Sequence, residues 1–249
     1  MFPYDHVLLA AVQKRPQSVA DVLQTMEAIG TACVDGDGLK WFNWLYHRVT
    51  QAVEARIAAG GFADPVWLAQ LDVQFAGLYF GALESALRGQ PSPGCWQALF
   101  ECRNCAAIAR IQFALAGINA HINHDLPQAI DATCDVTKTA PARDGQRYND
   151  YTTLNPTLDR IIGAAKQELR VRLLGDALPA ASRLEDTLAA WSVSAAREAA
   201  WRNAEIFWNL RPAPALTSNL MDTLDGLTTL ASKTLLVPVP GWNGPAQSV

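Results

Sequence analysis

Apolar side chains recur every three or four residues along almost the whole chain, which is the period of an amphipathic α-helix. No segment shows the strict polar–apolar alternation that is typical of a half-buried strand. We therefore expect an all-α fold, a single-domain helical bundle of about eight helices that includes residues 1–249. The clearest apolar stripe follows Asp37 and consists of Leu39, Phe42, Leu45, Tyr46, Val49, Val53 and Ile57.

Capping residues and prolines indicate where the helices begin and end. Ser18, Asp37 and the pairs Asp64–Pro65 and Ser92–Pro93 are typical of helix starts. Pro127 should break or kink a helix, because proline lacks the backbone N–H that the helix needs. The expected helices cover about 5–14, 18–33, 37–59, 65–88, 94–125, 126–136, 147–174, 182–210 and 217–235.

Two stretches lack helical periodicity. Residues 137–146 are polar, and we expect them to form a long loop or lid. Residues 236–249 contain three prolines and two glycines, and we expect them to form an extended tail over the surface.

Composition excludes several classes of protein. Half of the 249 residues are hydrophobic and 18% are charged, so the chain can bury a core and is not intrinsically disordered. The net charge is −4, which argues against a nucleic-acid partner. No uncharged apolar stretch is long enough to span a membrane, and the first residues do not resemble a secretory signal. We therefore expect a cytoplasmic protein.

The five cysteines do not suggest a disulfide framework, because their number is odd and no signal peptide is recognised. Cys102 and Cys105 form a C-x-x-C sequence, but it lies inside a helical pattern and has no second pair. We expect ordinary, partly buried cysteines, with a redox or metal role as the alternative.

The most informative residues are His121 and Asp125, because polar groups rarely sit beside an apolar helix face without a reason. They are four residues apart and therefore lie on one side of a helix. Three small neighbours, Ala114, Gly117 and Ala120, allow another helix or a ligand to approach closely. The pair is an acid–base pair or two metal ligands facing a pocket; the alternative is a structural pair.

Other polar and aromatic residues fall on apolar faces. Asp72 lies on the buried face of the predicted helix 65–88, where a carboxylate is costly unless it is paired. Arg197 could pair with Asp72 or with Glu198; both pairs could instead be structural. The candidate catalytic residues are His121, Asp125, Asp72 and Glu198, and the candidate substrate-binding residues are Asn119, Asn123, Tyr46, Tyr79, Trp41, Trp201 and Arg197.

Several segments together resemble an uncharacterised bacterial family of all-helical proteins. The most specific is the central NAHINHDLP motif at residues 119–127, and the resemblance extends from about Val19 to about Leu210. It implies a soluble helical domain with no settled activity or cofactor. It also implies that the candidate polar residues belong to one site: Asp72, His121, Asn123, Asp125 and Glu198.

A weaker likeness concerns metal binding. The spacing His121-x-x-x-Asp125 occurs as a ligand pair in helical zinc-dependent phospholipases and nucleases. Those sites need several more histidines and an N-terminal ligand, whereas this chain has four histidines in all. A three-zinc site is therefore not expected, although a single metal ion on His121, Asp125 and a further carboxylate remains an alternative.

These observations favour an enzyme. We expect acid–base chemistry, without a cofactor, on a mainly apolar small molecule held in a cavity between helices, such as an intermediate of specialised metabolism. The reaction could be an isomerisation, cyclisation, elimination or hydrolysis, and the protein could form a homodimer. The alternatives are a metal-dependent hydrolase with His121 and Asp125 as ligands, and a non-enzymatic binding or scaffold protein.

Overall fold

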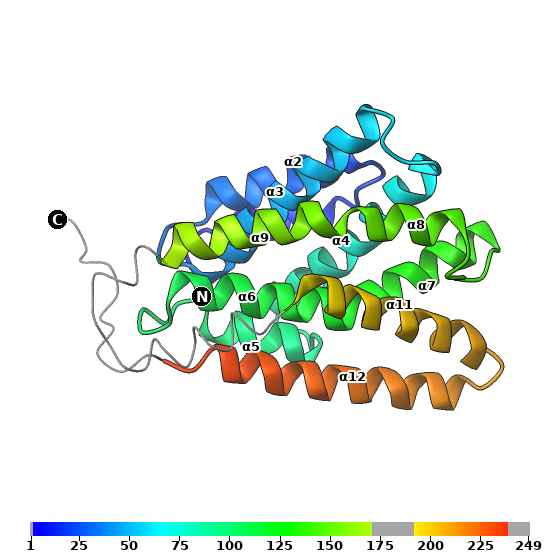
Figure 1. Ribbon diagram of the computed structural model, residues 1–249. Helices are drawn as coiled ribbons and strands as arrows, with labels where there is room; N and C mark the ends of the chain where they lie inside the picture. Colours follow the sequence, from blue (N-terminus) through cyan, green and yellow to red (C-terminus); the bar gives the residue numbers. More distant parts are fainter. Residues whose placement is uncertain (1, 171–191, 239–249) are drawn as a thin grey trace.

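The computed structural model describes residues 2–170 and 192–238 (Figure 1). Every regular element in these ranges is helical, which confirms the predicted all-α class. In chain order, the elements are α1 (Asp5–Gln13), α2 (Val19–Ala32), α3 (Gly38–Ala58), α4 (Pro65–Leu87), α5 (Gly94–Cys102), α6 (Arg110–Ala120), the π-helical turn η1 (His121–Asp125), α7 (Leu126–Thr137), α8 (Gln146–Thr153), α9 (Asn155–Arg170), α11 (Val193–Leu210) and α12 (Pro214–Leu235).

Helix α6 is the centre of the bundle, and each of its residues after Arg110 is buried. It packs against α3 on one side and against α5 and α12 on the other (Figure 1). Its continuation, α7, packs against α4 and α11. The close approach of α3 depends on Gly117, because an added Cβ would lie 2.3 Å from the Phe42 ring. The prediction that small residues on this helix admit a close neighbour is thus confirmed at Gly117.

Three predicted helix starts are present as expected. The side chains of Ser18, Asp37 and Asp64 accept hydrogen bonds from backbone N–H groups in the first turns of α2, α3 and α4, at 3.0–3.1 Å. These bonds satisfy N–H groups that have no partner inside the helix. Pro65 occupies the first turn of α4, where its missing N–H costs nothing.

The predicted long helix over residues 94–125 is wrong, because the chain breaks between α5 and α6. Arg103 causes the break: its buried guanidinium pairs with Asp37, and its carbonyl accepts from the backbone N–H of Gly38. The predicted cap at Ser92 is also wrong. Helix α5 is capped from a distance by Asp225 of α12, which accepts from the backbone N–H groups of Gly94 at 2.8 Å and Cys95 at 3.0 Å.

The predicted break at Pro127 is wrong, because α6, η1 and α7 follow one another without a gap. Because Pro127 cannot donate a backbone hydrogen bond, the helical ladder changes register just before it. The turn His121–Asp125 is π-helical, and the N–H of Leu126 bonds to the carbonyl of His121. Such turns often occur at functional sites.

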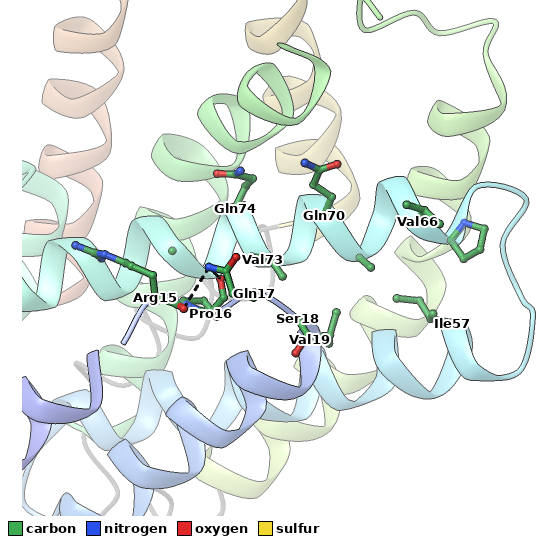
Figure 2. Close-up of a pocket in the computed structure, with 13 residues that line it drawn as sticks. Arg15, Pro16, Gln17, Ser18, Val19, Ile57, Val66, Gln70, Val73 and Gln74 are labelled. Carbon is green, nitrogen blue, oxygen red and sulfur yellow. Dashed lines mark hydrogen bonds between the residues drawn. The ribbon is translucent and has the colours of Figure 1, made fainter. Parts of the chain in front are cut away.

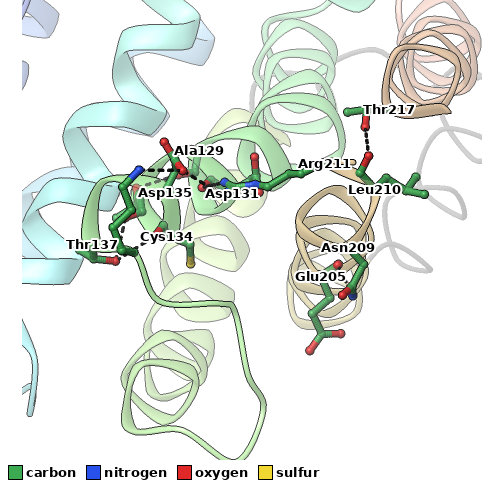
Figure 3. Close-up of polar contacts among 12 residues, drawn as sticks. Ala129, Asp131, Cys134, Asp135, Thr137, Glu205, Asn209, Leu210, Arg211 and Thr217 are labelled. Carbon is green, nitrogen blue, oxygen red and sulfur yellow. Dashed lines mark hydrogen bonds and ion pairs between the residues drawn. The ribbon is translucent and has the colours of Figure 1, made fainter. Parts of the chain in front are cut away.

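The other predictions concern the last third of the chain. Helix α11 ends at Leu210, as predicted. The next residue, Arg211, donates to Asp135 at 2.8 Å and to Asp131 at 3.0 Å and so ties α11 to α7 (Figure 3). In the described residues α11 starts after Ser192, its N-cap. The predicted start at Ser182, the end of the preceding helix near 174 and the tail beyond 238 lie outside the described residues. No helix in the described ranges is long and apolar enough to cross a membrane.

Candidate acid–base site

Asp125 is the centre of a buried polar cluster on η1. Its Oδ2 accepts from Nε1 of Trp96 at 2.9 Å and lies 2.8 Å from Nδ1 of His121. Its Oδ1 lies 2.7 Å from Nδ1 of His124. Each of the three partners therefore presents a nitrogen to one carboxylate. The predicted pairing of His121 with Asp125 is present, and two partners were not predicted.

Aromatic rings enclose the His121 imidazole. The ring of Phe75 stacks on it with centroids 3.4 Å apart, and the ring of Tyr46 meets it edge-on at 4.4 Å. Nε2 of His121 is buried and has no hydrogen-bond partner among the described residues. The remaining rings of the enclosure are those of Phe42, Tyr79 and Trp96.

The protonation states follow from burial and from the shared carboxylate. Burial lowers the pKa of His121 despite the opposing effect of Asp125, so the imidazole is neutral near pH 7. Burial alone would raise the pKa of Asp125, but hydrogen bonds from His121 and His124 lower it below the usual value. His124 is less buried, and its bond to Asp125 outweighs burial and raises its pKa. An ionised Asp125 accepts the Nδ1–H of His121, which leaves Nε2 of His121 unprotonated.

Asp72 and Phe75 line the same internal cavity, which lies between helices and is small and partly open. Oδ2 of Asp72 is buried and has no hydrogen-bond partner within the described part of the chain. Burial, and secondarily the charge of Glu54, raises the pKa of Asp72 to about 7. The cavity has a volume of about 50 Å³. Its polar lining residues are Tyr46, Asp72, Tyr151 and Arg197, and Phe75 is one of its apolar walls.

A second pocket lies beneath the predicted loop, which is confirmed between the end of α7 at Thr137 and the start of α8 at Gln146. The pocket has a volume of about 240 Å³ and is lined by Trp67, Trp201 and Arg147 together with the loop. Both indole N–H groups are buried and lack partners in the described ranges. The Trp201 ring, which lines this pocket, contacts the Tyr151 ring, which lines the internal cavity, with centroids 4.9 Å apart.

Glu198 is not part of the cluster around Asp125. Its carboxylate accepts from Nη1 of Arg143 at 2.8 Å and from the hydroxyl of Tyr148. Arg143 also binds Glu205, so the two glutamates fasten the loop to α11. The structure therefore places Glu198 at the loop rather than with Asp72.

Two other predicted residues make structural contacts. Arg197 does not pair with Asp72 or Glu198: it donates to the carbonyl of Tyr151 at 2.8 Å and to Asn155 at 2.7 Å. Trp41 lies away from the cavity, where its Nε1 donates to the carbonyl of Asp35 at 3.1 Å.

The two asparagines of the motif bind each other, and one of them joins two helices. Asn119 donates to the carbonyl of Thr228 and to the hydroxyl of Ser232, both at 3.0 Å, and so binds α6 to α12. Asn123 donates to Oδ1 of Asn119 at 2.9 Å. Both amides therefore hold the helix that carries His121 rather than lining the cavity.

The outer face of α4 borders a larger groove of about 850 Å³ against the loop from Arg15 to Ser18 (Figure 2). Val73 and Gln74 line this groove, whereas their neighbours Asp72 and Phe75 line the internal cavity. The groove contains one charged side chain, Arg15, and no carboxylate or histidine among the described residues that line it. It offers no acid–base pair, so the internal cavity is the better candidate.

Sequence reasoning missed Trp96, Phe75 and His124. His124 stands inside the motif, and its place next to Asp125 was the available signal. Trp96 and Phe75 belong to other helices, and their apolar positions are typical of any core residue. Only packing brings them to His121.

The fold and the site together define an all-α protein with a buried aspartate–histidine pair next to an internal cavity. A family model described as "Family of unknown function (DUF5995)" matches residues 19–238. The chain therefore belongs to this family, as its resemblance to an uncharacterised helical family indicates. Searches of curated proteins and of solved structures find no match to this chain.

Proposed function

We propose that this protein is an enzyme that performs acid–base chemistry on a small, mainly apolar molecule held between its helices. The observation that carries the proposal is the buried Asp72 carboxyl group, which has an unpartnered oxygen within the described part of the chain and lines the same cavity as Tyr46. Buried polar groups are nearly always hydrogen-bonded, so an exception calls for a role. Strongly perturbed ionisable groups in cavities are frequent at catalytic sites.

Asp72 and Tyr46, which both line the cavity, suit different tasks: Asp72 can transfer a proton, and Tyr46 can donate a hydrogen bond. With a pKa of about 7, Asp72 can accept or release a proton near neutral pH. Burial, and then the nearby Asp72 charge, raises the pKa of Tyr46, so its hydroxyl keeps its proton. That hydroxyl can donate a hydrogen bond to a substrate oxygen on which negative charge develops.

His121 supplies a second base behind Phe75. Asp125 fixes the imidazole through Nδ1 and leaves Nε2 as an acceptor, which is the arrangement of an aspartate-oriented histidine base. Phe75 stacks on His121 and also lines the cavity. Rotation of the Phe75 side chain would uncover the face of the His121 ring toward the cavity that Asp72 lines.

Substrate binding requires such an opening. A cavity of about 50 Å³ has room for water, whereas ligand sites usually measure about 300–1,000 Å³. The pocket beneath the loop is the proposed entrance, because the Trp201 ring that lines it contacts the Tyr151 ring that lines the cavity. Arg147 and Asp64, paired at 2.9 Å, both line this pocket and favour a molecule with hydrogen-bond donors and acceptors at one end. The reaction could be an isomerisation, cyclisation, elimination or hydrolysis.

The test uses chromogenic probes of proton abstraction and ester cleavage, 5-nitrobenzisoxazole and p-nitrophenyl acetate. Rates are measured in Phe75→Leu, which enlarges the cavity, with and without Asp72→Asn. We expect Asp72→Asn to lower the rate at least tenfold and to remove an inflection near pH 7. Asp222→Asn, an exposed change on α12, is the matched control. Equal rates with and without Asp72→Asn would overturn the proposal and favour a binding or scaffold protein.

Two further predictions accompany this function. A cytoplasmic location is tested by cell fractionation. A homodimer is tested by light scattering, and exposed leucines on α12, Leu227 and Leu230, are the apolar surface that favours it.

A further inference from the structure

Three side chains that the proposed chemistry does not use meet between α5, η1 and α12. They are Cys95, His124 and Asp225, and their ligand atoms all lie within 4.8 Å of one another. Cys95 and His124 are buried and Asp225 is half-buried. Thiolate sulfur, imidazole nitrogen and carboxylate oxygen are the three ligand types that zinc takes in proteins.

Two of the three ligands, Asp225 and His124, are already held in place by hydrogen bonds. Asp225 accepts from the backbone N–H groups of Gly94 and Cys95, which fixes its carboxylate beside the thiol. Nδ1 of His124 is bound to Asp125 at 2.7 Å, so the metal would take Nε2, which now lies 3.4 Å from the side-chain nitrogen of Gln128. A carboxylate bound to the far nitrogen of a histidine is the usual second contact of a zinc-bound histidine.

From this geometry we infer that Cys95, His124 and Asp225 bind one zinc ion, with Asp125 orienting His124. A tetrahedral ion with Zn–S of about 2.3 Å and Zn–N of about 2.0 Å needs donor atoms roughly 3.3–3.6 Å apart, so shifts of about 1 Å complete the site. The sulfur ligand favours zinc over magnesium or calcium. Three protein ligands leave the fourth position to water.

Binding displaces the protons that the ligand atoms of Cys95 and His124 carry, because a metal ion binds the thiolate and the neutral imidazole. Without metal, burial and the Asp125 and Asp225 carboxylates hold the Cys95 thiol in its protonated form by raising its pKa. The ion displaces the thiol proton to solvent and forms the S–Zn bond, with no oxidation or reduction. The site differs from the predicted His121–Asp125 metal pair, because Asp125 here orients His124 through a hydrogen bond and does not bind the ion itself.

The site is tested with the full-length reduced protein after dialysis against a chelator. Zinc chloride is titrated in competition with a chromogenic chelator, and cobalt(II) is added to a second sample to detect sulfur-to-cobalt charge transfer. We expect one zinc ion per chain and a thiolate band. Cys95→Ala should lose the band and bind zinc at least tenfold more weakly.

Two further variants serve as controls. One tests whether zinc binding is lost without a loss of folding, and the other tests whether zinc binds at the C-x-x-C sequence instead. Asp225→Asn keeps an oxygen that can cap α5, and should weaken zinc binding at least tenfold while the circular dichroism is unchanged. The double variant Cys102→Ser/Cys105→Ser removes the C-x-x-C sequence and should bind zinc like wild type. A wild type that binds no more zinc than Cys95→Ala, or a band that disappears in the double variant instead, would overturn the inference. Neither result depends on the Asp72 assay, so the two proposals fail separately.

Discussion

The Asp72→Asn substitution gives the sharpest test of whether the cavity carboxyl is structural or functional. A carboxylate in a stabilising ion pair has a lowered pKa, and its removal destabilises the protein most at high pH. Asp72 has the opposite property: its pKa is raised from 3.8 to about 7 by burial. The folded protein therefore holds this proton more tightly than the unfolded chain does.

The magnitude follows from the raised pKa. A folded-state pKa above the unfolded value stabilises the protonated folded state, so this advantage is fully present below about pH 4 and is lost as the pH rises to about 7. A pKa raised from 3.8 to about 7 corresponds to about 4 kcal/mol, at about 1.36 kcal/mol per pH unit. Between pH 5 and pH 8.5, the loss amounts to about 2–3 kcal/mol. The asparagine side chain of the variant cannot ionise, so the variant should escape that loss.

Urea unfolding followed by tryptophan fluorescence measures the effect. We expect the free energy of unfolding of Asp72→Asn, relative to wild type, to increase by about 2–3 kcal/mol from pH 5 to pH 8.5. All other titrating groups are common to both proteins and cancel in the difference. Asp222→Asn should show no such trend. A difference that is flat with pH, or that falls, would mean that Asp72 is solvated or paired, and the reasoning would be refuted.

Three other predictions follow from single contacts. Asp125→Ala leaves buried donors of His121, His124 and Trp96 without their acceptor, and should lower the free energy of unfolding by about 3–5 kcal/mol in urea; a loss below about 1 kcal/mol would contradict the cluster. Gly117→Ala forces a Cβ against the Phe42 ring and should cost about 1–3 kcal/mol by the same assay; an unchanged stability would show that α3 and α6 can move apart. Arg143→Ala should change the free energy of unfolding by less than about 1 kcal/mol, because its ion pairs are partly exposed. It should nevertheless speed amide hydrogen exchange in residues 138–145. Unchanged exchange would show that the ion pairs do not hold the loop.

The sequence predicted what depends on local chemistry. Ser18, Asp37 and Asp64 cap their helices because a cap needs only a side chain and the next few N–H groups. His121 and Asp125 meet because four residues along a helix suffice. The break at Arg103 could not be predicted, because it results from an ion pair with Asp37, 66 residues away. Asp225 replaces Ser92 as the cap of α5 for the same reason: the contact exists only after α12 has packed.

Asp125 connects a local contact, its pair with His121, to contacts that form only when distant helices pack together. One carboxylate has two oxygens, and here they serve two histidines that point to different places: His121 toward the aromatic enclosure and Phe75, His124 toward Cys95 and Asp225. Replacing the carboxylate by an amide would substitute a donor for one acceptor, so Asp125→Asn should disturb one histidine more than the other. If zinc affinity falls about 10–100-fold in that variant while the part of the Phe75→Leu rate that His121→Ala removes persists, the amide nitrogen has replaced Oδ1. The opposite result would place the amide nitrogen at Oδ2 and would assign the aspartate chiefly to His121.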